Sequence, residues 1–248
     1  MFITPTLATV ILIIGIMIGG LGIGGVLLVP SLKYLGGFEL HDVIPACMMS
    51  YMVTGVAGTI IFSRHGTINW RLAFNVCVGA LPGAYIGAYF LAELSAQLIE
   101  TGIALLLIYS GADALFKTDY KIDTSKAKAF NALYFHGFIA AIGSSLTGTG
   151  GPLLLIPMLM WHGVSALTAI GLSQVIQIPI SLMATVANYI HGDVDLQLSL
   201  TLALCLGIGA ISGAWAIHLL PVVKLKKFMA LLLILVGILL LNRIVMVT

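Results

Sequence analysis

Two glycine-rich breaks interrupt long apolar stretches at corresponding places in the two halves of this chain. Residues 22–25 are Gly-Ile-Gly-Gly, and residues 148–152 are Gly-Thr-Gly-Gly-Pro. A glycine in a helix interior costs roughly 1 kcal/mol relative to alanine, so neither stretch is expected to form one continuous helix. Inside a bilayer, irregular backbone is tolerated only where protein surrounds it or where it lines a cavity. Matched broken segments of this kind point to the substrate site of a membrane transporter.

The composition is that of a polytopic membrane protein. Of the 248 residues, 60% are hydrophobic and 8% are charged, whereas a soluble domain carries about 25% charged residues. The net charge of +2 is too small to suggest a nucleic-acid partner. The three cysteines lie in apolar segments without the spacing of metal ligands, so we interpret them as buried small hydrophobes and expect no cofactor.

Eight apolar segments approach or exceed the roughly 20 residues of helix that cross a bilayer. They cover residues 5–33, 40–63, 70–92, 95–117, 129–160, 164–190, 196–219 and 225–247. The first and fifth are too long for one straight crossing and contain the breaks. A polar linker from Lys117 to Lys128 divides the chain near its middle.

Further matches between the halves follow the breaks in the same order, which indicates an internal repeat. They are Ala46 and Ser50 with Ala169 and Ser173, Gly66 and Asn69 with Gly192 and Asp195, and Gly83 and Gly87 with Gly209 and Gly213. Small residues four apart share a helix face and let neighbouring helices approach closely.

The basic residues indicate how the repeats are oriented. If all eight segments cross, one side of the membrane collects seven lysines and arginines and the other four. If the first and fifth segments re-enter on their own side, the split is nine against two, which suits the excess of basic residues in cytoplasmic loops. The nine are Arg64, Arg71, Lys117, Lys121, Lys126, Lys128, Lys224, Lys226 and Lys227.

We therefore predict an all-α polytopic membrane protein made of two homologous four-segment repeats. The repeats are inverted, and each has one broken or re-entrant segment and three full crossings; parallel four-span repeats are the alternative. Residues 1–117 form the N-terminal membrane repeat, 118–128 a cytoplasmic linker, and 129–248 the C-terminal membrane repeat. Both termini are then expected in the periplasm.

At these motifs the chain resembles the sulfite exporter TauE/SafE family of bacterial membrane proteins. The resemblance rests on the glycine runs that lead into apolar residues and proline, at 22–30 and 148–157, and on the Ala-x-x-x-Ser helices that follow them. It also rests on the Gly-x-hydrophobic-Asn/Asp ends of those helices, at 66–69 and 192–195. It covers essentially the whole chain in duplicate.

The first half departs somewhat from the pattern, because Val26 stands where the second half has Pro152, and Asn69 where it has Asp195. The resemblance implies secondary transport of a small sulfur-containing anion, such as sulfite or an organosulfonate, across the bacterial inner membrane. It does not specify the cargo.

The breaks themselves suit an anion. A helix N-terminus offers unpaired N–H groups and about half a positive charge, and Pro152 suits the first helical position, where no N–H is needed. Half-helices that begin near Gly25 and Gly151 could hold an oxyanion near the midplane without a buried arginine. The glycines could instead serve only close helix packing.

Neutral polar side chains near the breaks could donate hydrogen bonds to an oxyanion. Ser173 and Gln177 share a helix face, although a serine can also bond back to its own helix carbonyl. The predicted substrate-binding residues are Gly22, Gly24, Gly25, Ser50, Gly148, Thr149, Gly150, Gly151, Ser173, Gln174 and Gln177. We interpret Glu100, Asp113 and His136 as residues at the membrane interface, although His136 could also carry a proton.

The leading hypothesis is thus a secondary transporter, and the alternative is an anion channel that uses the same pore. No Walker motif indicates direct use of ATP, and no reactive constellation within the apolar segments indicates an enzyme. The expected partners are a small sulfur oxyanion or sulfonate and membrane lipid. Proton or sodium coupling and assembly into a homo-oligomer stay open.

Overall fold

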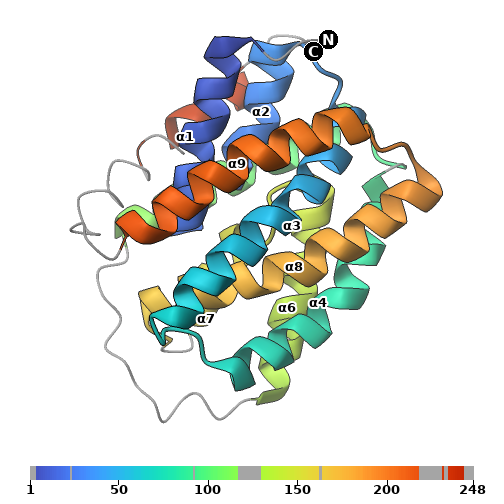
Figure 1. Cartoon of the computed structure of the whole chain (residues 1–248). Coiled ribbons are helices and arrows are strands. Elements are labelled where there is room, and N and C mark those ends of the chain that lie inside the picture. The colour runs from blue at the N-terminus through green and yellow to red at the C-terminus, as the bar shows by residue number, and fades with distance from the viewer. Residues whose placement is uncertain are drawn as a thin grey trace.

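The computed structural model describes residues 4–22, 24–91, 93–116, 130–161, 164–217, 231 and 234–242. Every regular element among them is a helix (Figure 1). The labelled helices are α1 (Pro5–Leu21), α2 (Gly25–Gly36), α3 (Leu40–Arg64), α4 (Trp70–Leu91), α5 (Ala96–Phe116), α6 (Phe130–Thr147), α7 (Pro152–Trp161), α8 (Ala166–His191) and α9 (Leu196–Ala216), and residues 234–242 are also helical. The predicted all-helical class is confirmed. Linker 118–128 and much of the segment predicted at 225–247 lie outside the described residues.

Four of the described helices are long and apolar enough to cross a membrane. They are α3, α4, residues Leu167–His191 of α8, and α9. In Figure 1 these helices lie side by side in the order α9, α3, α8, α4; α3 packs against both α9 and α8, and α8 packs against α4. Helix α1 packs against α9 and α6 against α4, so the two broken segments lie against this layer at its two ends.

The two predicted breaks are confirmed, because α1 stops before α2 and α6 stops before α7. Helices α1 and α2 form a hairpin. A Cβ added to Gly24 would lie 2.5 Å from the carbonyl oxygen of Ile14, and one added to Gly36 would lie 3.2 Å from Leu7 Cδ2. The end of α2 therefore returns to the start of α1. Helices α6 and α7 also fold back on each other, since a Cβ on Gly143 would lie 2.6 Å from Leu154 Cδ1.

Close helix packing explains the glycine pairs spaced four apart. A Cβ on Gly87 of α4 would lie 2.6 Å from the carbonyl oxygen of Ile142 on α6, and one on Gly83 would strike that of Phe138. On α9, Gly209 and Gly213 meet the backbone of α1 in the same way. The predicted small-residue faces are thus confirmed as places where two backbones touch.

The Gly-x-hydrophobic-Asn/Asp motif begins the next helix in each half. The N–H of Leu72 donates to Asn69 Oδ1 (3.3 Å), and the N–H of Leu198 donates to Asp195 Oδ1 (2.9 Å). Each side chain satisfies an N–H group that has no partner within the helix, which is the usual role of an N-cap residue. This part of the resemblance therefore has a structural role, at the starts of α4 and α9.

The directions of the helices differ between pairs. Helices α3 and α8 run antiparallel, because Gly58 meets Gln174 while Gly171, nearer the start of α8, meets Phe62, nearer the end of α3. Helix α1 runs parallel to α9: Gly15 meets Leu206, and Gly20, further along α1, meets Gly213. Helix α4 runs parallel to α6, because the contacts between them also advance in the same direction along both helices.

Candidate functional site

The first break is a left-handed glycine followed at once by a new helix. Gly22 has φ 71° and its N–H donates to the carbonyl oxygen of Ile18, which ends α1. A left-handed residue at this position is a common helix end, and glycine adopts it without steric cost. Gly24 already has a helical conformation (φ −66°), and α2 begins at Gly25.

The second break needs three glycines with positive φ. Gly148, Gly150 and Gly151 have φ values of 67°, 80° and 108°. Side chains on L-residues rarely tolerate these angles, so this turn depends on glycine for its conformation. Pro152 then occupies the first position of α7, as predicted, where its missing N–H is not needed.

The two breaks lie against each other inside the protein. A Cβ on Gly22 would lie 3.2 Å from Cβ of Pro152, and one on Gly25 would collide with the carbonyl oxygen of Thr149. All four residues are buried. The half-helices α2 and α7 therefore begin next to each other, although they are more than a hundred residues apart in the chain.

Tyr51 joins the two breaks, and the sequence interpretation missed it. Its fully buried hydroxyl lies 2.9 Å from the carbonyl oxygen of Gly25 and 3.1 Å from that of Gly148, and it can donate to either. The signal was present: Tyr51 follows Ser50 as Gln174 follows Ser173. A polar aromatic residue at the position of a predicted site glutamine marks the same location in the other half.

The predicted polar residues of α3 and α8 are all buried, and their hydroxyl groups bond locally. Ser50 donates to the carbonyl oxygen of Cys47, and Ser173 to that of Ile170, both at 2.7 Å. Ser173 nevertheless faces the first break, because its Oγ would lie 3.0 Å from a Cβ on Gly22. The bond back to the own helix is thus observed, and it leaves the oxygen of Ser173 beside the break.

The two glutamines of α8 differ in their bonding. Gln174 Nε2 donates to the carbonyl oxygen of Ile18 near the end of α1 (2.8 Å). Gln177 is fully buried, and neither its Nε2 nor its Oε1 has a hydrogen-bond partner in the structure. Its Nε2 would lie 2.8 Å from a Cβ on Gly150, so this free amide group lies against the second break.

Further buried polar atoms without partners lie on the same face of α8. They belong to Ser181 and Asn188, which are four and eleven residues beyond Gln177 and therefore project within a narrow sector of the helix. Leaving a buried polar group unsatisfied costs about 1–3 kcal/mol. This face thus carries a cost that folding alone does not explain.

One pair of oppositely charged side chains lies at the end of α2 that is away from the breaks. Glu100 of α5 forms an ion pair with Lys33 and accepts a hydrogen bond from the hydroxyl of Tyr34 (3.3 Å), which ties the C-terminal end of α2 to α5. The side chains that meet the breaks, including Tyr51, Ser173 and Gln177, are uncharged. Among the described residues, no group of three or more histidine, cysteine, aspartate or glutamate side chains could hold a metal ion.

This arrangement of paired breaks can be compared with known proteins. The model of the sulfite exporter TauE/SafE family matches residues 7–240. The chain belongs to the TauE/SafE family. The expected family membership is therefore confirmed over nearly the whole chain.

Curated relatives of this TauE/SafE protein are named as transporters. It is 24% identical over 88% of its length to the probable membrane transporter protein YdhB of Bacillus subtilis, of which the match covers 92%. It is 26% identical over 90% of its length to a probable membrane transporter protein of Haemophilus influenzae, also covered to 92%. The match to YunE of Bacillus subtilis, another probable membrane transporter protein, is 22% identical over 83% of this chain and 84% of that one. No solved structure matches.

Proposed function

We propose that this protein is a secondary transporter that carries a small sulfur-containing anion, such as sulfite or an organosulfonate, across the bacterial inner membrane. The observation that carries the proposal is the meeting of two helix starts beside a buried glutamine that has no partner. Membership of the TauE/SafE family supports transport of a sulfur oxyanion, and the site chemistry supports an anion.

Helix starts attract negative charge. The N-terminus of a helix carries about half a positive charge and N–H groups without partners inside the helix. Helices α2 and α7 bring two such ends together, and Gln177 adds an amide N–H. These groups are neutral overall, so the empty site carries no uncompensated charge. An anion held there would be released more easily than one paired with an arginine, as transport requires.

The proposed architecture is a pair of inverted repeats with re-entrant hairpins. Helices α3 and α8 occupy equivalent places after the two breaks, and they run antiparallel. Inverted repeats require this arrangement, whereas in parallel repeats the equivalent helices would run in the same direction. Helix α1 of the first half packs parallel to α9 of the second half. Helix α6 of the second half packs parallel to α4 of the first half, so the same kind of pair forms twice with the halves exchanged. The return of α2 towards the start of α1 favours a hairpin that enters and leaves on one side.

The polar face of α8 would extend the path of the anion. Gln177, Ser181 and Asn188 run from the second break towards the C-terminal end of α8, and each has a buried polar atom without a partner. Eleven residues of helix span about 16 Å, roughly half of a hydrocarbon core about 30 Å thick. A path along this face would give these atoms hydrogen-bond partners as the anion and its waters pass.

Flux through purified protein in proteoliposomes tests the function. We expect labelled sulfite or a sulfonate to accumulate inside against its own gradient when a proton or sodium gradient is imposed. Sulfate and thiosulfate serve as competitors that rank the cargo. Flux that follows only the gradient of the anion would indicate a channel, and absence of flux for both sulfite and the sulfonate would contradict the proposal.

The topology has its own test. We expect reporter fusions at both termini to give periplasmic signals, and a fusion at residue 122 to give a cytoplasmic one. Cytoplasmic signals from both termini would instead favour eight full crossings.

A further inference from the structure

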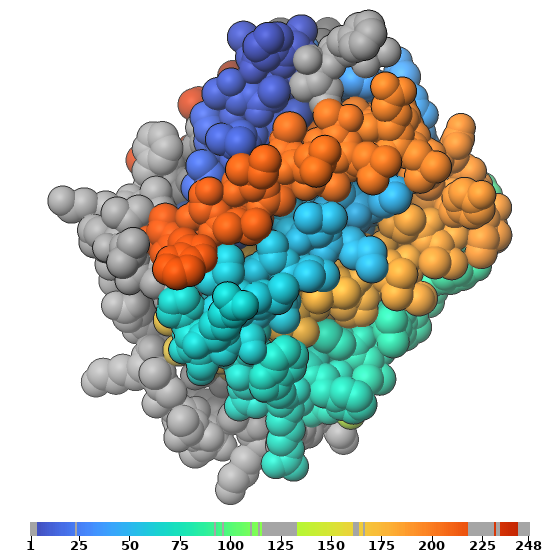
Figure 2. All heavy atoms as spheres, viewed as in Figure 1, coloured from blue at the N-terminus to red at the C-terminus, as the bar shows by residue number. Residues whose placement is uncertain are grey.

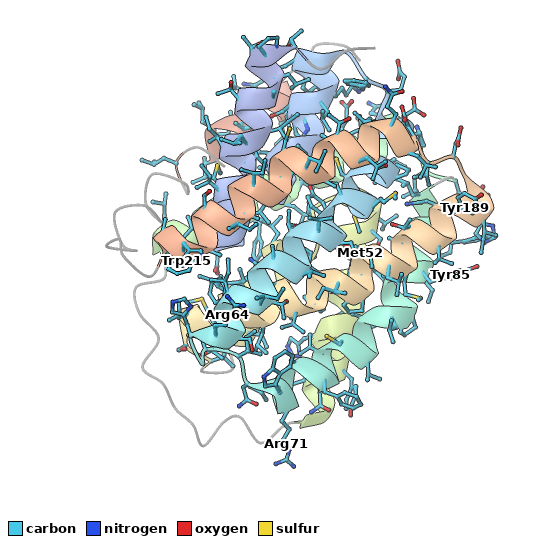
Figure 3. The ribbon with its side chains drawn as sticks, viewed as in Figure 1. Met52, Arg64, Arg71, Tyr85, Tyr189 and Trp215 are labelled. Carbon is cyan, nitrogen blue, oxygen red and sulfur yellow. The ribbon has the colours of Figure 1, made fainter. Side chains whose placement is uncertain are left out.

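A long apolar groove runs along the outer surface between α3 and α9, away from the two breaks. Its volume is about 590 Å³, and its walls are residues of α3 from Met52 to Ile61 together with Ile211 and Trp215 of α9. Among the described residues that line it, only Arg64, at the end of α3, is charged. In Figure 3, Arg64 and Trp215 lie at one end of the groove and Met52 lies towards the other.

The floor of the groove comes from the close packing of the two helices. A Cβ on Gly207 of α9 would lie 3.0 Å from Val53 Cγ1, so α9 approaches α3 closely at this level. On either side of this contact, larger apolar side chains stand out from the surface; Val56 and Ile211 are 41% and 47% exposed. Both helices are visible on the same face in Figure 2. The result is a concave apolar surface that faces outward.

The guanidinium group of Arg64 is available to a ligand. It is exposed, and no hydrogen bond or ion pair to the described part of the chain occupies it. The neighbouring His65 packs edge-on against Trp215, with 6.0 Å between ring centroids. Tryptophan favours the level of the lipid headgroups in membrane proteins. This end of the groove therefore has the features of a headgroup site, with a positive charge and an interfacial aromatic residue.

The length of the groove fits one leaflet. Met52 and Arg64 are twelve residues apart on α3, which corresponds to about 18 Å of helix. Half of a hydrocarbon core is about 15 Å thick. An acyl chain that follows the groove from Arg64 would therefore end near the middle of the bilayer.

We propose that this groove binds one anionic phospholipid, with its phosphate on Arg64 and an acyl chain along α3 and α9. The charge of Arg64 selects the lipid: it has no acidic partner among the described residues, so the site prefers a headgroup with net negative charge. A guanidinium group can donate two parallel hydrogen bonds to a phosphate. The binding does not depend on the anion site at the breaks, so either proposal can fail without the other.

Quenching of tryptophan fluorescence by brominated lipid tests the site. The full chain with Trp70→Phe and Trp161→Phe retains Trp215 as its single tryptophan. We expect phosphatidylglycerol with brominated chains to quench Trp215 with an apparent affinity about fivefold higher than brominated phosphatidylcholine, the preference that one basic residue near a membrane surface provides. Arg64→Gln should reduce this preference to near one.

The chain offers a matched control in Arg71, another exposed arginine, on the first turn of α4 and outside the groove. Arg71→Gln should leave the preference intact. Val56→Trp, measured by phospholipid retained on purification, should lower the bound phosphatidylglycerol because it fills the middle of the groove. Equal affinity for the two lipids, or a preference that survives Arg64→Gln, would overturn the proposal. Protection of Trp215 from both lipids with concentration-dependent dimerisation would assign the groove to a second copy instead.

Discussion

The two breaks share a sequence pattern but need glycine for different reasons. At the first break, Gly24 and Gly25 have no special backbone angle to maintain; a Cβ on Gly24 would press on the backbone of α1, and one on Gly25 on Thr149. At the second, Gly150 and Gly151 have positive φ values that side chains disfavour. The breaks thus differ at their last two glycines, which need space in the first and positive φ values in the second; Gly22 and Gly148, which open the breaks, both have positive φ. The same four-residue motif can therefore respond differently to the same substitution.

The polar side chains beside the two breaks also differ, in the hydrogen bonds that they make. After Ser50, the first half has Tyr51, whose hydroxyl group lies within hydrogen-bond distance of a carbonyl oxygen in each break. After Ser173, the second half has Gln174, which bonds to α1, and then Gln177, which has no partner. The first half holds the two turns together, whereas the second leaves an amide free. We infer that the second half contributes more of the substrate contacts.

The largest expected effect comes from filling the breaks. Gly24→Leu and Gly150→Leu should each abolish anion flux while the protein still inserts, because neither position accommodates a branched side chain. Gly150→Asn should keep part of the flux, since asparagine tolerates the left-handed region, whereas Gly24→Asn should keep none. The measurement is sulfite flux in proteoliposomes at matched protein levels.

Gly66 is the control for these substitutions. It has φ 68°, and nothing lies within 4 Å of a Cβ placed there, so Gly66→Leu isolates the conformational cost alone and should preserve most of the flux. Equal residual flux in Gly24→Asn and Gly150→Asn would remove the distinction between the two breaks.

The next largest effect is expected at Tyr51. Tyr51→Phe removes the hydroxyl group that donates to the buried carbonyl oxygen of Gly25 or of Gly148, at a cost of about 1–3 kcal/mol. We expect a lower Tm in detergent and flux reduced by about tenfold. A variant with unchanged Tm and flux would show that the hydroxyl group does not hold the breaks together.

Substitution of Gln177 should weaken sulfite binding without lowering the stability of the protein. Gln177→Met keeps a similar shape and removes a buried amide without partners, so Tm should stay the same or rise. Sulfite binding should weaken by roughly fivefold to tenfold, as expected for the loss of about 1 kcal/mol or somewhat more. The matched variant Gln174→Met should lower Tm instead, because it removes the hydrogen bond from Gln174 Nε2 to the carbonyl oxygen of Ile18. Thermal unfolding with and without sulfite measures both quantities.

The smallest effects are expected at the two serines. Their hydroxyl groups already donate to their own helices, so Ser50→Ala and Ser173→Ala should weaken sulfite binding by about threefold or less. Ser173→Ala should have the larger effect of the two, because its oxygen lies beside Gly22. In the double variant with Gln177→Ala the losses need not add, since neighbouring donors couple. If all of these variants bind sulfite as tightly as the unsubstituted protein, the anion site lies elsewhere and the glycines of the breaks serve only close helix packing.

Much of the local structure of the candidate site could be predicted from the sequence because its signals are local. Glycine runs inside apolar stretches predicted where α1 and α6 would end, and Pro152 predicted where α7 would begin. Buried glutamines are rare enough in an apolar helix that Gln174 and Gln177 stood out. Tyr51 did not stand out, because a tyrosine in an apolar segment is ordinary until its hydroxyl group is seen to have two carbonyl groups of distant turns within reach.

The sequence by itself determined the apolar segments, the interruption of two of them and the small-residue faces, because helix propensity, left-handed glycine and hydrophobic length act within a few residues of the chain. Only the tertiary structure decided that the two breaks touch, that Tyr51 joins them, and that Gln174 Nε2 is bonded while the Nε2 of Gln177 has no partner. These features depend on how α3 crosses α8 and how α1 and α6 pack on the opposite halves. Such contacts join residues between 26 and 156 positions apart, and they follow from the packing of complete helices rather than from any local pattern.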